Sequence, residues 1–343
     1  MRKVSLILLG FGNVGQAVAR LILRKSLALE DQFQVRVKVN GIATGRHGRA
    51  VDPRGLDLEA ALNLAQQGKS LDALSYQKAP LDNCEFIRTC PADAVFETTP
   101  VNHQTGQPAI DHLRAALVSG KHAVTANKGP VVHGFQELNN LAQQNGLRFL
   151  YESTVMDGAP IFSLIRAALP GAEVRGFHGI LNSCTNLILE RMESGDDFEA
   201  AVDYAQQIGI AETDPTADVD GWDAAIKVAA LSTAVLGVPL TPQQVRREGI
   251  GGISTQMMQA ALDDGERWKL VCRATRTPDG VDASVQPQRV GPRSPLYSVN
   301  GTSSYVEFET DVLPGLGVLE NDPSPETTAY GMLADLLNIL RGV

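Results

Sequence analysis

The chain lacks most of the features that mark nucleic-acid-binding, membrane or secreted proteins. It has no run of lysine and arginine, and its 39 acidic residues outnumber its 30 basic ones, giving a formal net charge of -9. This charge disfavours nucleic acid and anionic membranes as partners. No apolar stretch approaches the roughly 20 residues that cross a bilayer. The four cysteines form no CxxC pair, so neither a disulfide framework nor a zinc site is indicated, and we expect a reduced, cytoplasmic setting.

A signal peptide is not expected either. Residues 4–9 are mostly apolar and follow Met-Arg-Lys, but this run is too short and leads into glycines, not a cleavage site. The 343 residues, 43% of them hydrophobic and 20% charged, have ordinary globular composition. Such a length suffices for two domains, each with its own core.

A glycine-rich turn follows the first apolar run. Residues 4–9 are typical of a strand buried on both faces, and residues 16–23 have helical spacing. A GxGxxG motif alone is weak evidence. Between a strand and a helix it is specific, because glycines let the backbone approach a pyrophosphate at the helix N-terminus. The predicted dinucleotide-binding residues are Gly10, Phe11, Gly12, Asn13, Val14 and Gly15.

The residues around the second predicted strand favour NADP over NAD. Residues 34–43 are expected to form this strand, and the sequence TGR follows, ending at Arg46 with no acid. An acid there would bind the ribose of NAD, whereas a nearby arginine accommodates a 2′-phosphate. Glu30 and Asp31 precede the strand and are expected in a solvated loop. Arg46 is therefore the predicted NADP contact, with NAD as the alternative.

Strands and helices alternate up to about residue 151. Strands are predicted at residues 93–97, 122–125 and 147–151, and helices at residues 108–119 and 135–144. This alternation predicts an α/β domain with a doubly wound parallel sheet of the Rossmann type. Open sheets of this kind bind ligands at the carboxyl ends of their strands. Three residues at such ends join the predicted cofactor site: Thr98, Thr99 and Lys128.

The pattern changes after residue 152. Predicted segments are helices at 159–169, 186–192 and 198–208, and strands at 174–181, 281–290 and 305–310. The alternating strands suit a one-sided antiparallel sheet, so the second domain is expected to be α+β. An amphipathic helix at residues 325–340 is expected to return to the first domain. The predicted domains are residues 1–154 completed by 318–343, which bind the dinucleotide, and residues 155–317, which bind substrate.

The stretch from residue 209 to 231 carries the most informative pattern. A polar loop with several carboxylates leads into a predicted helix, on which Asp223 and Lys227 are four residues apart and share a face. Apart from Lys227, residues 224–231 are all apolar, so this helix is expected to be buried. A buried lysine needs a partner, and its proton affinity is open to tuning, as proton transfer requires. A solvent-exposed ion pair is the structural alternative.

These motifs resemble the homoserine dehydrogenases along nearly the whole chain. The matching segments are residues 10–15, 125–130 (TANKGP), 152–155 (ESTV), 179–182 (GILN) and 212–227. The last is the most specific, with Glu, Asp-Pro and Asp followed by Gly-x-Asp-x-x-x-Lys. The resemblance implies reduction of L-aspartate 4-semialdehyde to L-homoserine with NAD(P)H, in threonine, methionine and isoleucine biosynthesis. It also implies a short form without the appended regulatory domain, and a homodimer formed through the sheet of the second domain.

The resemblance further implies roles for individual residues. Lys227 corresponds to the proton donor to the aldehyde oxygen, Asp223 orients it, and Lys128 lies between nicotinamide and substrate. The implied substrate-binding residues are Glu212, Asp218, Asp223, Ser183 and Cys184, with Glu212 facing the amino group. The implied ligands of a monovalent cation such as Na⁺ are backbone carbonyls of Glu152, Val155, Asp157 and Ala159.

The chain departs from the family pattern near the substrate and the cation. The glycine-rich cation segment reads VMDG at residues 155–158, and a substrate-lining Gly-Thr is replaced by Ser183-Cys184. The aromatic residue common two positions before the substrate glutamate is Ile210 here. Leu316 is bulkier than the residue that usually stands in the glycine turn before the last helix.

Two alternatives remain open. Residues 183–186 (SCTN) are similar to the nucleophilic segment of thiol-dependent aldehyde dehydrogenases, but such a cysteine needs an imidazole partner. All six histidines precede Cys184, whereas those enzymes place a catalytic histidine after it, which favours a small buried thiol. The other alternative is a dinucleotide-binding sensor without catalysis, since fold alone does not fix function. The presence of both Lys227 and Asp223 argues against it.

Overall fold

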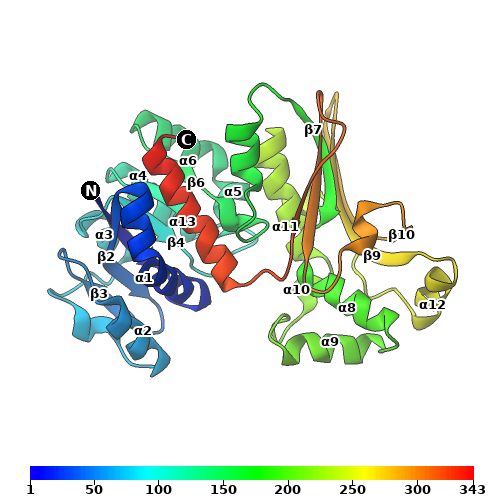
Figure 1. The fold of residues 1–343 in the computed structure, drawn as a ribbon, viewed down its shortest axis with the longest axis horizontal. Helices are drawn as coiled ribbons and strands as arrows, with labels where there is room; N and C mark the ends of the chain where they lie inside the picture. The colour runs from blue at the N-terminus through cyan, green and yellow to red at the C-terminus, as the bar shows by residue number, and fades with distance from the viewer. The chain divides into compact units, whose positions relative to one another are not determined.

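The computed structural model describes residues Met1–Val343, and the chain forms two units (Figure 1). The first unit consists of Met1–Pro160 together with Ser324–Val343, and the second unit is Ile161–Pro323. No helix combines the length and the apolarity that a membrane crossing requires.

The first unit is a six-stranded sheet with helices on both faces. In sheet order, its strands are β3 (Gly48–Val51), β2 (Val35–Thr44), β1 (Arg2–Leu9), β4 (Ala94–Glu97), β5 (His122–Thr125) and β6 (Phe149–Leu150). Neighbouring strands are parallel except for β2 and β3, which form an antiparallel hairpin. The helices are α1 (Asn13–Phe33), α2 (Leu58–Gln66), α3 (Asn83–Thr89), α4 (Ala109–Val118), α5 (Lys128–His133), α6 (Phe135–Gln144) and α13 (Pro325–Arg341), with 3₁₀ turns η1 (Leu71–Leu74) and η2 (Glu152–Thr154). The predicted Rossmann-type parallel sheet is confirmed.

Alternate side chains of β1 supply both faces of this sheet. Leu6 and Leu8 belong to an apolar cluster with residues of α1, α2 and α13, whereas Ile7 and Leu9 pack with residues of α3 and α4. All four are at most 1% exposed, because the side chains of a strand alternate between faces and this strand is covered on both. The carboxyl end of β1 is therefore held firmly where the glycine loop begins.

The helix α13 lies beside α1 in the first unit (Figure 1). Met332 and Leu336 of α13 enter the same apolar cluster as α1. Ser153 also donates a buried 2.7 Å hydrogen bond to the Thr328 carbonyl. The amphipathic pattern that predicted this helix at residues 325–340 is confirmed.

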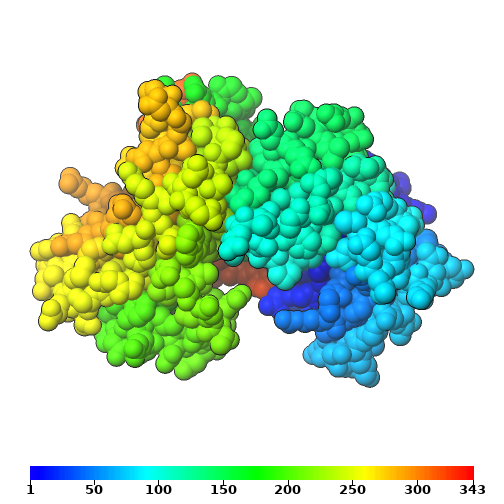
Figure 2. All heavy atoms as spheres, turned by 180° about the vertical axis from the view of Figure 1, so that it is seen from behind, coloured from blue at the N-terminus to red at the C-terminus, as the bar shows by residue number.

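The second unit is a mostly antiparallel sheet with helices. In sheet order, its strands are β12 (Leu316–Glu320), β11 (Ser304–Thr310), β7 (Val174–Ile180), β9 (Arg267–Thr277), β10 (Gly280–Val290) and β8 (Arg246–Arg247). The helices are α7 (Ile161–Ser163), α8 (Ser183–Glu193), α9 (Phe198–Gln207), α10 (Thr216–Val219), α11 (Trp222–Leu231) and α12 (Thr255–Asp263), with short turns η3 (Leu164–Ala168), η4 (Ser232–Leu236), η5 (Pro242–Gln244) and η6 (Pro295–Ser298). Helix α11 packs on β9 and β10, and α8 also packs on β9. The α9 and α12 segments lie at the surface of this unit (Figure 2, green and yellow). The predicted antiparallel sheet is confirmed, and its central strand β9 was not anticipated.

Three local expectations were wrong. Glu30 and Asp31 lie in the last turns of α1, not in a loop, because Leu29 is buried in the first cluster and extends the helix. The polar loop before α11 contains the short helix α10. The helix expected at residues 159–169 becomes a short α-turn followed by a π-helical turn.

Candidate active site

The glycine loop joins β1 to α1 and leaves one position open. Gly12 is the N-cap of α1, and no side chain caps this helix. A Cβ at Gly10 would lie 2.5 Å from Thr98 Oγ1, and one at Gly15 would lie 2.3 Å from the Gly10 carbonyl oxygen. The fold itself therefore requires both glycines. A Cβ at Gly12 would meet no atom within 4 Å, so its absence leaves room for a ligand at the helix N-terminus, as a pyrophosphate requires.

The other predicted loop residues differ in exposure. Phe11 is buried in the apolar cluster below the loop, so its ring packs in the core. Asn13 is exposed at the start of α1, and Val14 is partly buried against the same cluster. The residues that face solvent at the helix start are thus Gly12 and Asn13.

Thr98 and Thr99 both form hydrogen bonds at the carboxyl end of β4. Thr98 Oγ1 donates to the Leu9 carbonyl at 3.0 Å, which ties β4 to the start of the glycine loop. Thr99 donates from its backbone nitrogen at 2.9 Å, and from its hydroxyl, to the carboxyl of Glu97, and Thr125 donates at 2.9 Å to the same group. Glu97 is fully buried. Burial raises its pKa, whereas the hydrogen bonds from Thr99 and Thr125 lower it by a smaller amount. Sequence reasoning placed Glu97 only in a buried strand, although an acid at such a strand end was a usable signal.

Lys128 begins helix α5 at the end of the neighbouring strand. The helix is capped by Asn127, whose side-chain oxygen accepts from Gly129 N at 3.0 Å and whose amide donates to the Thr99 carbonyl at 3.1 Å. The predicted position of Lys128 beyond β5 is therefore fixed through Asn127, and its side chain is partly buried. Thr99 and Lys128 lie at adjacent strand ends.

Arg46 lies in the exposed turn between β2 and β3. Its backbone nitrogen donates to Thr44 Oγ1 at 3.2 Å. Gly10 N donates to the Ala43 carbonyl at 2.9 Å, so this turn and the glycine loop adjoin at the carboxyl ends of β1 and β2. Arg46 is thus at the expected end of the sheet, on a hairpin that the sequence did not reveal.

In the second unit, Lys227 is held by two partners on a buried helix. Its Nζ lies 3.2 Å from Asp223 Oδ2 and donates to the Leu181 carbonyl at 2.6 Å. The other residues from Ala224 to Leu231 are fully buried, and the Lys227 side chain is 14% exposed. The predicted burial of this helix and the shared face of Asp223 and Lys227 are both confirmed. The solvent-exposed ion pair is excluded by this burial.

Asn182 joins two carboxylates, and sequence reasoning did not select it. Its amide nitrogen donates to Asp218 Oδ1 at 2.6 Å and to Asp223 Oδ2 at 3.0 Å. Its side-chain oxygen accepts from Thr185 N at 2.8 Å, which makes Asn182 the N-cap of α8. A residue that caps a helix and bridges two acids is constrained from both sides. The GILN segment contained it, but only the fold brings it to the acids.

Asp218 and Cys184 share the same buried corner. Burial raises the pKa of Asp218, and the nearby Asp223 carboxylate raises it further, while Asn182, Lys227 and Cys184 oppose this shift. Burial raises the pKa of the Cys184 thiol, and the negative charge of Asp218 raises it further. The thiol is therefore neutral near pH 7, which argues against a thiolate nucleophile. The structure thus brings Asp218, Cys184, Asp223 and Lys227 together.

Two other predicted substrate residues, Ser183 and Glu212, make contacts elsewhere. Ser183 hydrogen-bonds Ser304 at 3.2 Å, which links the first residue of α8 to β11. Glu212 is exposed, and its backbone carbonyl accepts from Gln206 at 3.1 Å.

The predicted cation ligands lie in one irregular segment of the first unit. Glu152 is in the η2 turn and is buried, and Ala159 N donates to the Met156 carbonyl at 2.8 Å. Asp157 has a left-handed backbone (φ 35°), and its carboxylate accepts from Thr328 at 2.6 Å. The chain contains no group of three or more His, Cys, Asp or Glu side chains arranged to hold a metal ion.

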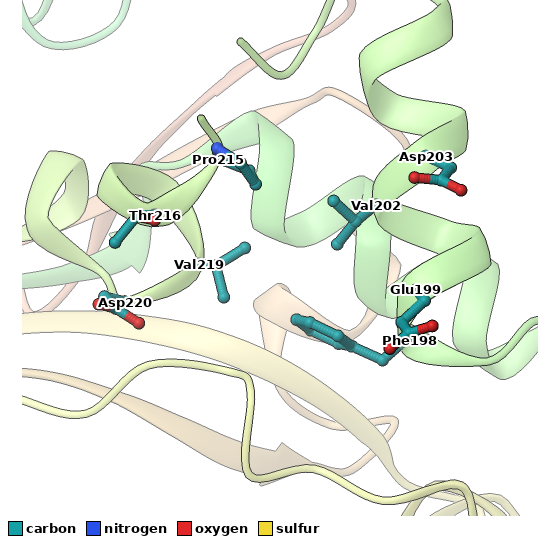
Figure 3. A pocket seen from close by; sticks show the side chains of 8 residues that line it. All are labelled: Phe198, Glu199, Val202, Asp203, Pro215, Thr216, Val219 and Asp220. Carbon is teal, nitrogen blue, oxygen red and sulfur yellow. The ribbon is translucent and has the colours of Figure 1, made fainter. Parts of the chain in front are cut away.

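A separate groove of about 310 Å³ lies between α9 and α10 (Figure 3). Its lining combines apolar and acidic side chains: Phe198, Glu199, Val202, Asp203, Pro215, Thr216, Val219 and Asp220. None of the predicted site residues lines it, so it is distinct from the Lys227 group.

The chain is a nicotinamide-dinucleotide-dependent oxidoreductase that acts on a CH–OH group, and two family models match it. The model described as homoserine dehydrogenase matches residues 160–337, and the model of the homoserine dehydrogenase NAD binding domain matches residues 10–152. The chain therefore belongs to the homoserine dehydrogenase family.

Relatives and solved structures agree with this assignment. The chain is 36% identical to an NAD(+)-dependent homoserine dehydrogenase of Pseudomonas canavaninivorans over 99% of this chain and 97% of the relative. It is 35% identical to a homoserine dehydrogenase of Methanocaldococcus jannaschii over 98% of each chain. A crystal structure of homoserine dehydrogenase from Thermoplasma acidophilum matches with a TM-score of 0.82 and 28% identity, covering 100% of both chains. These matches favour a homoserine dehydrogenase over a thiol-dependent aldehyde dehydrogenase and over a non-catalytic sensor.

Proposed function

We propose that Lys227 exchanges the proton of the substrate oxygen as L-aspartate 4-semialdehyde and L-homoserine interconvert. The observation that carries this role is the placement of Lys227 Nζ beside Asp223 and the Leu181 carbonyl on an otherwise apolar helix. In the reducing direction, Lys227 donates its proton to the aldehyde oxygen. In the oxidising direction, the neutral amine accepts the hydroxyl proton. Asp223 holds the amine in place and favours its protonated form.

Asp218 is proposed to bind the amino group of the substrate, with Glu212 as a second contact. The α-ammonium of homoserine carries a positive charge, and the Asp218–Asp223 corner concentrates negative charge. A bound cation favours the ionised carboxylate, so it offsets the burial that raises the pKa of Asp218. Cys184 and Ser183 are proposed to line the same site as neutral groups. Substrate binding is then expected to release a proton where Asp218 was protonated.

The dinucleotide is proposed to bind along the carboxyl edge of the first sheet. When bound, it supplies or accepts a hydride at its nicotinamide ring. The residues proposed to hold it are the loop from Gly10 to Gly15, Thr98, Thr99 and Lys128, with Gly12 giving the pyrophosphate its room. Arg46 is proposed to contact the 2′-phosphate of NADP, because it is exposed on the adjoining turn. The NAD(+)-dependent relative makes NAD the alternative.

Three further proposals concern the surroundings of the enzyme. Backbone carbonyls of Glu152, Val155, Asp157 and Ala159 are proposed to hold a monovalent cation such as Na⁺, which the irregular backbone of this segment supports. A homodimer is proposed to form through the sheet of the second unit. A cytoplasmic location is proposed, supported by four cysteines that are all free.

Absorbance at the reduced-nicotinamide band tests the proposed reaction. Purified protein with NADP⁺ or NAD⁺ should produce reduced cofactor only when L-homoserine is added. L-Serine, which is one methylene shorter, is the matched control and should give little signal. A preparation that binds the dinucleotide but shows no homoserine-dependent absorbance would contradict the proposal.

A further inference from the structure

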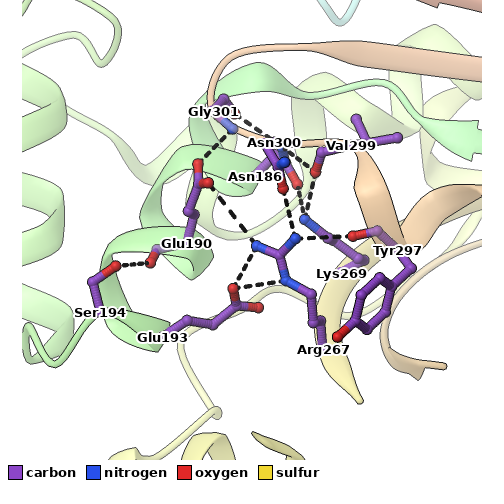
Figure 4. A network of polar contacts seen from close by, with 10 residues as sticks. All are labelled: Asn186, Glu190, Glu193, Ser194, Arg267, Lys269, Tyr297, Val299, Asn300 and Gly301. Atoms are coloured by element: carbon purple, nitrogen blue, oxygen red, sulfur yellow. Dashed lines mark hydrogen bonds and ion pairs between the residues drawn. The ribbon is translucent and has the colours of Figure 1, made fainter. Parts of the chain in front are cut away.

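One face of α8 carries a row of polar side chains that are all engaged. Asn182, Asn186, Glu190 and Glu193 follow one another at spacings of four, four and three residues, so they share a face of the helix. The partners of Asn186, Glu190 and Glu193 come from β9 and from residues 297–301 (Figure 4). The N-terminal member is Asn182, which bridges the two carboxylates of the candidate site. The row therefore connects that site to the body of the second unit.

Lys269 of β9 lies at the centre of this row and is completely buried. Its Nζ donates to Asn186 Oδ1 at 2.9 Å and to the Val299 carbonyl at 2.6 Å. The Asn186 amide in turn donates to the Val299 carbonyl at 3.2 Å and to the Gly301 carbonyl at 2.8 Å. Figure 4 shows these groups converging from the helix, the strand and the loop. Asn186 is thereby fixed in one orientation by three partners.

The direct hydrogen-bond acceptors of Lys269 are neutral. Burial lowers its pKa to about 8, and Arg267 lowers it further, while Glu193 and Glu190 oppose this. A well-packed apolar side chain often stabilises a protein as well as a buried charge does. The hydrogen bonds of Lys269 and Asn186 do something an apolar contact cannot, because directional contacts select one arrangement of the groups that make them. The network thus specifies the rotation of α8 about its axis.

We propose that Lys269 is a positioning residue for the reaction: by holding Asn186 it fixes α8, and so keeps the Asn182 amide between Asp218 and Asp223. Asn182 is one helical turn before Asn186, so a rotation of the helix at Asn186 displaces the amide that reaches the carboxylates. The inference rests on the proposed roles of Asp223 and Lys227. It adds a residue that touches neither substrate nor cofactor.

The variant Lys269→Met tests this role, with Arg267→Met as the matched control. Arg267 lies two residues earlier on the same strand and binds the same helix at Glu193, three turns away from Asn182, with Glu190 at 4.0 Å. Both variants remove a β9 cation that holds α8, fully buried at Lys269 and partly buried at Arg267, and should lower the melting temperature. Only Lys269→Met should reduce kcat/KM for homoserine, by up to about 100-fold, as expected for a small misplacement of a catalytic group.

The pH profile separates positioning from a general loss of stability. The proposed binding of the substrate ammonium uses ionised Asp218, whose pKa is raised in the folded protein, so kcat/KM for homoserine should rise with pH as Asp218 loses its proton. The Asn182 hydrogen bond lowers the pKa of Asp218, so loss of this amide raises that pKa and moves the rising limb to higher pH. Lys269→Met should therefore move this limb in the same direction as Asn182→Ser, and Arg267→Met should leave it in place.

Asn186→Ala breaks the same contact from the helix side and gives the same test if Lys269→Met does not fold. A folded variant of either kind with wild-type kcat/KM and pH profile would overturn the proposal. An equal shift in Arg267→Met would also overturn it, because the effect would then be general. A wild-type protein without homoserine-dependent activity would instead refute the proposed reaction, which keeps the two failures apart.

Discussion

Asn182 donates its side-chain amide to Asp218 at 2.6 Å, although 36 residues separate the two in the chain. The same nitrogen lies 3.0 Å from Asp223, so a single amide is shared by two acids. Two like charges in one buried corner repel each other, and the amide dipole partly offsets this repulsion. The acid pair can therefore remain beside Lys227 without a second cation. This arrangement leads to predictions for Lys227, Asp218 and Cys184.

Lys227→Ala is expected to lower kcat by roughly 10²–10⁴-fold, the usual contribution of a positioned acid–base group. The dissociation constant of the dinucleotide should change little, because the glycine loop belongs to the first unit. The measurements are kcat, cofactor binding and melting temperature on one preparation. A folded variant that retains more than about a tenth of wild-type kcat would exclude the proton-transfer role.

Asp218→Asn is expected to stabilise the protein at pH 7 while reducing activity. The folded protein raises the pKa of Asp218 above its ordinary 3.8, so the ionised form is less favourable in the folded than in the unfolded chain. That loss is absent at low pH, grows as pH rises past the unfolded-state pKa, and is complete above the folded-state pKa. Asparagine removes it, so the gain in melting temperature should be larger at pH 7 than near pH 4.

The matched control for this change is Asp214→Asn in the same loop. Asp214 is exposed, and hydrogen bonds from Thr216 lower its pKa, so its removal should give no such gain. A lower melting temperature for Asp218→Asn at pH 7 would contradict the assigned direction of the pKa shift.

Cys184→Ser is expected to keep substantial homoserine oxidation. A serine hydroxyl can still donate to Asp218, and the raised pKa of the thiol leaves no thiolate for Cys184 to use as a nucleophile near neutral pH. Rapid-mixing kinetics with the aldehyde substrate should show no acyl-enzyme burst in the wild type. A correctly folded but inactive Cys184→Ser enzyme would revive the thiol-dependent mechanism.

The wild type is expected to have a lower KM for NADPH than for NADH, and Arg46→Ala should narrow this difference. The physical reason is the loss of an exposed cation beside the site proposed for the 2′-phosphate. Arg54→Ala is the control, because Arg54 is also exposed but is paired with Asp52 at 2.9 Å. A wild-type KM for NADH equal to or lower than that for NADPH would contradict the prediction.

Local patterns in the sequence predicted the parts of this molecule that depend on near neighbours. Asp223 and Lys227 are one helical turn apart, so periodicity alone placed them on one face of a buried helix. The glycine loop was equally clear, because a strand and a helix flank it directly. These are contacts within a few residues, which spacing can encode.

Contacts between distant segments could not be read in the same way. Asn186 and Lys269 are 83 residues apart, and nothing in either local sequence signals that they meet. The strand β9 was not anticipated, because the buried Lys269 and the arginines around it obscure the alternation of a half-buried strand. The family resemblance placed Asp218 and Cys184 in one site, but not the amide that joins the acids.

The position of α13 bears on how the chain is made. Its apolar residues complete the cluster around α1, yet they are synthesised more than 290 residues after that helix. Until residues 325–341 emerge from the ribosome, the α1 side of the first sheet has no cover from this helix. The second unit, Ile161–Pro323, is contiguous in the sequence, so it can fold before α13 is synthesised. The nascent dinucleotide-binding unit therefore completes its apolar cluster only when the last helix has been synthesised.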